Sequence, residues 1–287
     1  MKIFLYKFRA IAVLLLILSI GGCSDTRISA RNDTEDIVDY SAAHLELSEL
    51  PSVDDLPKID NIIKGELIVG KNIELAGINW LVLDKQDDKV LLLSDRILEH
   101  RAYHEYWEYV RWETSSLREY LNGEFITNTF DEQEQSRILE TIVVNDSNPW
   151  YMTDGGNDTI DKVFLLSLNE VIKYFGDSGQ LVDRPLDEGQ FGFSSGSKYV
   201  CCIHDQFDMK RMAYDLKGIT SVWWLRTPGF PDHSEGFSFA SCIDGGELPG
   251  YIFLTGSPAC TNSEYVSGYY EYDSAGVRPA LWFDLRE

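Results

Sequence analysis

Runs of apolar residues mark the strands that the chain is expected to form. Apolar positions over residues 66–83 and 90–93 flank the polar turn Gln86-Asp87-Asp88, and this pattern predicts a hairpin. The stretches 222–229 and 276–283 are short apolar runs that each hold one arginine closely followed by a proline. We expect these two to be core strands that bracket an aromatic-rich insert. Further strands are predicted over residues 141–144, 162–166, 236–242 and 251–255.

Helices are predicted where a Ser, Thr or Asp is followed three residues later by Glu, the pattern of a capping box. Glycines at 123 and 176 are expected to stop the first and the third of these helices, and a further short helix is expected over 209–214. The pairs are Ser116 with Glu119, Asp131 with Glu134, and Ser167 with Glu170. Helices and strands follow in mixed order without βαβ alternation or internal repeat, so the sequence predicts an α+β domain with short helices and long loops.

The first 23 residues have the pattern of a lipoprotein signal peptide. Lys2, Lys7 and Arg9 form a basic region, and the apolar run 10–20 is too short for a bilayer span of about 20 residues. The run closes with Ile20, and the small residues Gly21 and Gly22 directly precede Cys23, which is then expected to carry the lipid. Resemblance to bacterial lipoproteins implies two or three acyl chains, hence stable anchoring. An ordinary secretory signal, or a short anchor with a chance cysteine, is the alternative.

Residues 24–60 are expected to be an acidic, flexible tether. Acidic residues far outnumber Arg27, Arg31 and Lys58, and Pro51 and Pro57 interrupt the segment. Such a composition buries too little apolar surface to offset the entropy lost on ordering. The pattern allows a short helix over 42–50, and the rest is expected to extend through self-repulsion and lift the domain from a membrane.

The remaining residues, 61–287, fit one larger-than-average globular domain. The formal net charge of the chain is −22, which excludes nucleic-acid binding by neutralisation of phosphates and flat association with anionic lipid. The seven tryptophans and the aromatic content of 13% suit either a rigid core or platforms on which ligands stack. Cations, basic surfaces and neutral sugars remain as partners.

Several motifs resemble an uncharacterised bacterial domain family that is common in cell-surface proteins and lipoproteins of gut Firmicutes. The resemblance runs from about Ile62 to Leu285 and implies no particular activity. Ser115 stands where the family commonly has a cysteine, Thr227 stands where it usually has a serine, and residues 199–212 resemble an insert. The motifs are Trp-Glu-Thr-Ser-Ser-Leu-Arg at 112–118, Leu-Asn-Gly at 121–123, Gly-Asn-Asp-Thr at 156–159, Asp-Lys-Val-Phe-Leu-Leu-Ser at 161–167, Trp-Trp-Leu-Arg-Thr-Pro-Gly at 223–229 and Val-Arg-Pro-Ala-Leu-Trp at 277–282.

A more distant resemblance is to the C-type-lectin-like fold. A Trp-Trp-Leu-Arg strand, a variable stretch and a final Gly-Val-Arg-Pro-Ala strand are similar to the branch of that fold with formylglycine-generating enzymes and retroelement-diversified receptors. In that branch the loops before the last strand form the ligand face, so the resemblance implies a binding module with residues 256–276 as its face. The closely spaced copper-binding cysteines of the enzymes have no match here, and their activity is not expected.

A candidate Ca²⁺ site lies in the loop that follows residue 145. Hard cations prefer several oxygen ligands on a tight loop that contains glycine. The spacing is not that of an EF-hand, and the alternative is a polar turn in which Asn and Asp side chains bond their own backbone. The candidate ligands are Asp154, Asn157, Asp158 and Asp161.

Cysteines and histidines offer weaker candidates. Outside the cytoplasm the four cysteines that remain after lipidation are expected to pair, and Cys242 with Cys260 is the favoured bridge among three connectivities. Cys201 and Cys202 with His204 match no zinc spacing. His100, His104 and His204 could each serve as a base, but no nucleophile motif accompanies them.

Two arginines and several aromatics complete the candidate residues. An arginine in a core strand needs a carboxylate or carbonyls, so Arg226 and Arg278 are expected to be structural rather than ligand contacts. Trp223, Trp224 and Trp282 are expected in the core. The better ligand candidates are the four tyrosines of the insert, Tyr265, Tyr269, Tyr270 and Tyr272.

The sequence favours a binding module over an enzyme. We expect an extracytoplasmic protein, held on the bacterial membrane by its lipid, that binds glycan or protein ligands. A cell-envelope hydrolase acting on wall polymer is one alternative, and a structural envelope lipoprotein is the other.

Overall fold

The structure of the protein is a computed structural model that describes seven ranges of the chain. All of them belong to the compact unit Asp39–Glu287, and the other unit, Met1–Val38, lies outside them. Cys23, the helix expected over 42–50 and the four insert tyrosines also lie outside the described residues. None of the helices that the structure describes has the length and apolar content needed to cross a bilayer. The described ranges are 52–61, 67–105, 109–185, 202–232, 237–243, 252–254 and 275–286.

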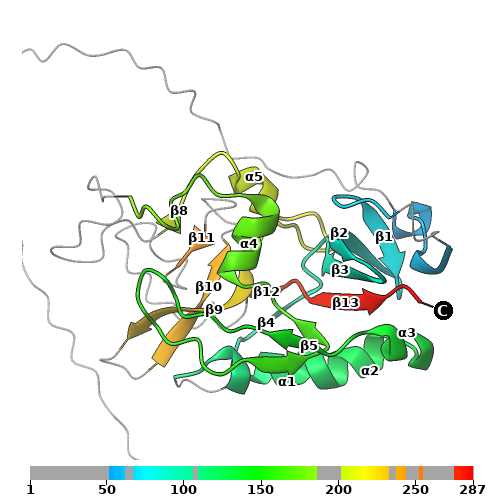
Figure 1. The fold of residues 1–287 in the computed structure, drawn as a ribbon, viewed down its shortest axis with the longest axis horizontal. Coiled ribbons are helices and arrows are strands. Elements are labelled where there is room, and N and C mark those ends of the chain that lie inside the picture. The colour runs from blue at the N-terminus through cyan, green and yellow to red at the C-terminus, as the bar shows by residue number, and fades with distance from the viewer. Residues whose placement is uncertain are drawn as a thin grey trace, which may run out of the picture. The chain divides into compact units, whose positions relative to one another are not determined.

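A five-stranded antiparallel sheet forms one side of the domain (Figure 1). Residues 90–93 at its centre are all nearly inaccessible, as expected for a strand covered on both faces. The turn predicted at Gln86-Asp87-Asp88 is confirmed, with Asp87 in the left-handed conformation at φ 48°. In spatial order the strands are β1 (Asn72–Leu75), β2 (Ile78–Gln86), β3 (Lys89–Ser94), β13 (Ala280–Asp284) and β7 (Val163–Phe164).

A six-stranded sheet forms the other side. Its pairs are antiparallel except for β12 and β9, which run parallel where Gly276 faces Trp223. In spatial order the strands are β4 (Glu99–Arg101), β12 (Ala275–Val277), β9 (Trp223–Asp232), β10 (Phe237–Ile243), β11 (Ile252–Phe253) and β8 (Cys202–Ile203).

The stretch 276–283 was expected to be a single core strand, and this prediction was wrong. It forms two strands in two different sheets, β12 in the six-stranded sheet and β13 in the five-stranded one. Proline has no N–H to donate to a ladder, so the strand breaks at Arg278-Pro279. The Pro279 carbonyl accepts from Ser94 N at 2.9 Å as the chain crosses. This short crossing joins the two sheets.

Two of the three predicted capping boxes are confirmed. The prediction for the first helix placed its cap one residue too late. Asp131 caps α3 (Glu132–Arg137), and Ser167 caps α4 (Leu168–Phe175), which ends at Gly176 with φ 100°. At α1 (Ser116–Tyr120) the cap is Ser115, whose Oγ accepts from Arg118 N. Gly123 was expected to end this helix, but it does not. The chain continues through a π-helical turn, η5 (Leu121–Phe125), into α2 (Ile126–Thr129).

The expected helix at 209–214 is the single turn α5 (Asp208–Arg211). Short 3-10 turns complete the helical elements: η2 (Val53–Asp55), η3 (Ile59–Asn61) and η4 (Trp112–Thr114). The packed domain begins earlier than the tether boundary predicted at residue 60. Ile59 is only 4% exposed, the Pro57 carbonyl accepts from Glu74 N at 3.0 Å, and Asp60 pairs with Arg137. Burial of Ile59 supplies the apolar contact that a tether would lack.

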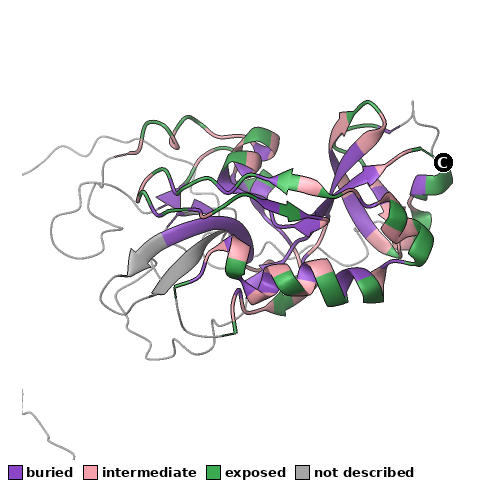
Figure 2. Ribbon diagram, turned by 60° about the horizontal axis from the view of Figure 1, so that its bottom comes forward, coloured by how far each residue is buried: buried purple, intermediate pink, exposed green. Residues whose placement is uncertain are grey.

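A two-stranded ribbon, β5 (Thr141–Val143) with β6 (Thr159–Asp161), lies outside both sheets. The strand expected over 162–166 is only β7, and residues 165–167 lead into α4. Figure 2 shows that the buried residues concentrate on the strands, whereas the run from α1 to α3 exposes its outer side. Mixed helices and mainly antiparallel sheets confirm the α+β class.

Candidate functional site

The segment between β5 and β6 is a long, anchored hairpin loop. Asn148, which is fully buried, fixes it through all four of its side-chain hydrogen bonds. Its amide donates to Pro228 O at 2.8 Å and Leu254 O at 2.9 Å, and its Oδ1 accepts from the main-chain N–H groups of the next turn, Trp150 N and Tyr151 N. Thr153 adds a bond to Gly229 O at 2.6 Å. The loop is therefore held against the six-stranded sheet.

This loop forms one wall of a hollow of about 540 Å³. Its other wall is the chain that follows α4. The volume falls within the range that small-ligand sites occupy. The lining residues are Pro149, Trp150, Leu181, Val182, Asp183 and Arg184.

Trp150 and Arg184 join the two walls. The indole Nε1 donates to Leu181 O at 3.0 Å. The Arg184 guanidinium lies 4.7 Å from the Trp150 ring and 4.9 Å from the Tyr151 ring, and its Nη2 donates to the Tyr151 hydroxyl at 3.2 Å. Cation–π contacts of this kind hold both partners in place. The pocket is therefore largely preformed.

Asp183 contributes a carboxylate that nothing in the described structure neutralises. Its main-chain N–H donates to Gly179 O, and its side chain is exposed. Among the residues that the structure describes, none bonds or ion-pairs with this carboxylate. The neighbouring Val182 is 87% exposed, and Met152 on the facing loop is 77% exposed. An acceptor and apolar surface thus lie side by side at the pocket.

The Asp183 wall rests on a buried ionic cluster. Asp177 accepts from Gln180 N and Leu181 N, and the Gln180 amide donates to His204 O at 2.6 Å. Ser178 donates to Asp205, which pairs with the inaccessible Arg211 at 2.7 Å. Burial raises the pKa of Asp205, but hydrogen bonds from Phe207 N, Ser178 and Arg211 outweigh it, so the pKa lies below its ordinary value. The lowered pKa favours the charged form of Asp205, which is the form that pairs with Arg211.

His204 and Asp208 are part of the same cluster. The His204 Nδ1 bonds the buried Asp208 carboxylate, which also pairs with Arg211. Half of the His204 side chain is exposed. A carboxylate on Nδ1 fixes the orientation of the imidazole ring, as in sites where a histidine acts as a base. His100 and His104 lie elsewhere, on Ser221 Oγ and on Ser116 N respectively.

The acidic loop expected to bind Ca²⁺ holds its side chains on protein partners. Asp154 pairs with Arg111 at 2.7 Å and accepts from Gly156 N. The Asn157 side chain donates to Glu113 at 2.8 Å. Asp158 accepts from Asn145 N at the start of the loop, 3.1 Å away. These bonds belong to a structural loop.

Asp161, the fourth candidate ligand, is directed into the core instead. It is 1% exposed, pairs with Arg118 at 2.7 Å and accepts from Trp112 Nε1 at 2.9 Å. Within this loop the side-chain oxygen of Asn145 is buried without a partner. Among the described residues no three His, Cys, Asp or Glu side chains gather in a way that could hold a metal ion. The structure does not bring the four predicted ligands together.

Arg226 is 4% exposed, and it bonds both a carboxylate and main-chain carbonyls. Its Nη1 donates to Glu170 at 2.5 Å and to Leu165 O at 2.6 Å, and its Nη2 donates to Val144 O at 3.1 Å. Arg226 therefore connects β9 with α4 and the ribbon. Its contacts are internal to the fold.

Arg278 is buried where the chain crosses between the sheets. It donates to the carbonyls of Ser94 and Asp95 and lies 4.7 Å from the Trp223 ring, while its Nη1 has no partner. Burial lowers the pKa of Arg278 to about 10, and the charge of Asp95 opposes this only in part. Trp223, Trp224 and Trp282 are 0%, 8% and 8% exposed, respectively.

Part of the cysteine prediction lies outside the described residues. Cys202 is buried on β8, and Cys242 lies on β10 opposite Trp224. Cys201 and Cys260 are not described, nor are Tyr265, Tyr269, Tyr270 and Tyr272. The segment that holds these tyrosines leaves the described structure after Leu254, whose carbonyl bonds Asn148 in the pocket loop.

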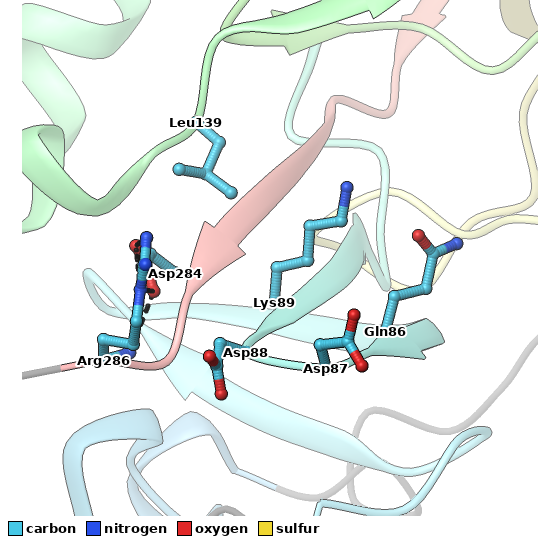
Figure 3. A pocket seen from close by; sticks show the side chains of 7 residues that line it. All are labelled: Gln86, Asp87, Asp88, Lys89, Leu139, Asp284 and Arg286. Atoms are coloured by element: carbon cyan, nitrogen blue, oxygen red, sulfur yellow. Dashed lines mark hydrogen bonds and ion pairs between the residues drawn. The ribbon is translucent and has the colours of Figure 1, made fainter.

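A second hollow, of about 200 Å³, lies at the β2–β3 turn (Figure 3). Its cations already have partners: Lys89 lies 4.6 Å from the Trp282 ring, and Arg286 bonds both oxygens of Asp284. Those bonds lower the pKa of Asp284 to about 2. Figure 3 shows Leu139 on the far side of β13 from the turn. This hollow offers a ligand less than the Trp150 pocket does.

The sequence alone did not predict the pocket residues Trp150, Asp183 and Arg184 as a site. One signal was present: a Trp-Tyr pair at 150–151 stands in a polar, glycine-rich stretch with no strand or helix to bury it. The partner wall lies about thirty residues further on, and only the fold brings the two together.

One of three comparisons with known proteins found a match. A family model described as Domain of unknown function (DUF6273) matches residues 87–285, from the β2–β3 turn to the end of β13. No curated protein and no solved structure matches the chain. The expected membership of an uncharacterised domain family is confirmed, although the match begins at residue 87 rather than 62. The chain belongs to the DUF6273 family.

Proposed function

We propose that the protein is a binding module whose ligand is a glycan held in the Trp150 pocket. The observation that carries the proposal is the combination, in one preformed hollow, of an aromatic residue and an unneutralised carboxylate, Asp183. A sugar ring presents C–H groups to aromatic surface and hydroxyl donors to a carboxylate. Small-ligand sites commonly combine aromatic side chains with a few fixed polar groups.

The pocket's position supports a face built from several loops. The Asn148 loop and the chain after α4 form its walls, and the segment with the four tyrosines departs from Leu254 beside it. A lectin-like ligand face formed by loops next to the last strands would have this arrangement. We propose that Tyr265, Tyr269, Tyr270 and Tyr272 extend the same face, and that a protein ligand with exposed sugars could be held there.

Lipid anchoring through Cys23 completes the proposal, because the sequence ahead of it has the pattern of a lipoprotein signal. Acyl chains would hold the acidic protein on the outer side of a bacterial membrane. Metabolic labelling with an alkyne fatty acid tests this part. Labelling should occur in the native chain and vanish in Cys23→Ser, and labelling that survives the substitution would contradict it.

The main test is binding of the full chain, purified in detergent, to a panel of glycans and peptidoglycan fragments. Trp150→Ala should weaken the best ligand at least tenfold, and Asp183→Asn should weaken it by a similar factor. Tyr109→Ala removes a 39% exposed aromatic residue that does not line the pocket and serves as the matched control. Equal binding by all four proteins would refute the site. Repeating the titration in EDTA tests whether the Ca²⁺ expected from the sequence contributes to binding.

A cell-envelope hydrolase is the second candidate, favoured by the His204–Asp208 pair. The geometry suits a general base, and such a base could act on wall polymer. Incubation with peptidoglycan, followed by chromatography of the soluble fragments, tests it. Release of fragments by the native chain but not by His204→Ala would support the enzyme, and no release by either would remove it.

A further inference from the structure

The outward face of the β5–β6 ribbon is an apolar patch on an otherwise acidic protein. Ile142 and Ile160 are direct cross-strand partners and are 71% and 65% exposed. Val144, just beyond the end of β5, is 48% exposed. Single exposed apolar residues are ordinary, but three adjacent β-branched residues on one strand face are the pattern of an interaction surface.

The opposite face of the ribbon shows that this exposure is not a sign of loose packing. Val143, Thr159 and Asp161 point inward and are 3%, 7% and 1% exposed. A strand places successive side chains on opposite faces, so fixing these three residues fixes the outward direction of the isoleucines. The ribbon presents its apolar side because the buried side is specified by Asp161 and its partners.

On each side of the ribbon one carbonyl is bonded to an arginine, whereas the isoleucine face is exposed. Arg226 Nη2 donates to Val144 O at 3.1 Å, and Arg118 Nη2 donates to Ile160 O at 3.4 Å. These arginines occupy carbonyls that an added strand would need. A partner would therefore pack its side chains on the face rather than extend the sheet.

The charges around the patch indicate the partner's chemistry. Alternation and register place Glu140 and Asp158 on the same face as the isoleucines, at either end of the patch. Both residues are exposed, and one Asp158 oxygen also accepts from Asn145 N. The basic residue at that level, Lys162, directs its ammonium to Gln135 O at 3.3 Å. A second copy of the chain, with the same net charge of −22, would place its own acidic rim against this one, and the two would repel each other.

We propose that the Ile142–Ile160 face is a docking surface for a partner protein that carries an apolar patch flanked by lysine or arginine. The surface is independent of the Trp150 pocket as a site, although the ribbon is the stem of the hairpin whose loop lines that pocket. Apolar burial between the two patches provides affinity, and the acidic rim selects a basic partner and speeds its approach.

The probe for this surface is a display library of random dodecapeptides, selected against the full chain in mild detergent. Selected peptides should carry several large apolar residues and a net positive charge. The double variant Ile142→Thr/Ile160→Thr keeps β-branched side chains on the ribbon and removes most of the apolar face. It should bind the selected peptides at least tenfold more weakly, and 0.5 M NaCl should weaken binding to the native chain.

Leu216→Thr, at a residue 59% exposed outside the ribbon, is the matched control and should bind as the native chain does. Unchanged binding to the double variant, or selected peptides without positive charge, would overturn the proposal. Failure to select any peptide would also count against it. Concentration-dependent dimers of the native chain that the double variant does not form would identify a second copy as the occupant instead. Glycan binding by the double variant separates this surface from the pocket.

Discussion

Asp161 and Asp183 are two carboxylates of one domain, and they differ in how their charges are partnered. Asp161 is 1% exposed and bonds Arg118, Trp112 and Thr159. Asp183 is exposed on a pocket wall, and no described residue bonds its carboxylate. The first is fixed by its partners to maintain the fold, whereas the second remains available to a ligand.

The same contrast separates the two groups of residues to which these carboxylates belong. The Trp112–Arg118 and Asp161–Ser167 motifs and Arg226 bond mainly to one another and to the backbone. Trp150 and Asp183 stand outside every motif by which the sequence resembles its family. These motifs therefore contribute to the scaffold, whereas the proposed ligand contacts come from residues outside them.

The largest expected effect is on stability, from Asp161→Ala. Loss of this carboxylate leaves Arg118 without its ion partner and the Trp112 N–H without an acceptor. Removing one member of a buried pair costs about 3–5 kcal/mol of unfolding free energy. Asp183→Ala should change it by less than about 0.5 kcal/mol while weakening ligand binding. Urea unfolding followed by circular dichroism measures both variants, and similar losses in the two would erase the distinction.

Asn148→Asp tests the residue that connects the two regions. Its amide donates to Pro228 O and Leu254 O, and a carboxylate there would face two carbonyls without a proton to offer. We expect a loss of about 2–4 kcal/mol from these unsatisfied buried groups. Ligand binding should also fall, because repulsion from the two carbonyls would displace the side chain that accepts from Trp150 N.

Asn169→Asp is the control for this substitution, since Asn169 is exposed and its side chain bonds only Asp146 among the residues that the structure describes. It should change the stability by less than about 1 kcal/mol. Native glycan affinity in a folded Asn148→Asp variant would show that the pocket does not depend on this anchor. The scaffold and the pocket would then be less connected than their bonds imply.

Local sequence signals predicted the local structure well. Asp131 and Ser167 cap their helices as the Glu three residues later indicates, and Asp87 makes its hairpin turn. These features depend on contacts within a few residues. The break at Pro279 shows the limit, because the proline was visible in the sequence but the two sheets that it separates are formed by distant strands.

The candidate site was harder to predict, for a physical reason. The acidic residues at 154–161 have the composition of a cation loop, but Arg111, Glu113 and Arg118 reach them from more than forty residues away. Spacing along the chain does not reveal these partners. Trp150 and Arg184 likewise meet only in the folded protein, and the tyrosines of the insert remain a prediction.

A pair of glycines provides a smaller test of how tightly the pocket loop is held. A Cβ on Gly155 would lie 2.1 Å from Asn145 O, a backbone atom that can move only with the loop. Gly155→Ala is therefore expected to cost about 1–3 kcal/mol and to weaken ligand binding.

Gly123→Ala is the matched substitution on the scaffold, where a Cβ would meet nothing within 4 Å. A helical alanine in place of glycine should stabilise the protein by about 0.5–1 kcal/mol. Thermal unfolding of the two variants should thus shift in opposite directions. A stabilised Gly155→Ala variant would show that the loop can move away from Asn145 without cost.

The smallest effect on stability is expected at alkaline pH, and it involves Tyr120. Its partner is Glu99, another carboxylate of the scaffold. Burial and the hydrogen bond from its hydroxyl to Glu99 raise the pKa of Tyr120 to about 12, against the opposing charge of Arg101. An unfolded tyrosine ionises near pH 10. The stability linked to this proton is therefore complete below pH 10 and is lost as the pH rises to about 12.

Tyr120→Phe removes this titration, so between pH 9 and pH 11.5 the variant should lose less stability than the native chain. The other fourteen of the fifteen tyrosines are common to both proteins, and the difference between their urea midpoints isolates Tyr120. Tyr109→Phe controls for the loss of a hydroxyl at a more exposed position and should follow the native profile. Parallel pH profiles for the native chain and Tyr120→Phe would mean that Glu99 does not hold the Tyr120 proton. The surroundings of Glu99 would then resemble the open pocket more than the closed pairing around Asp161.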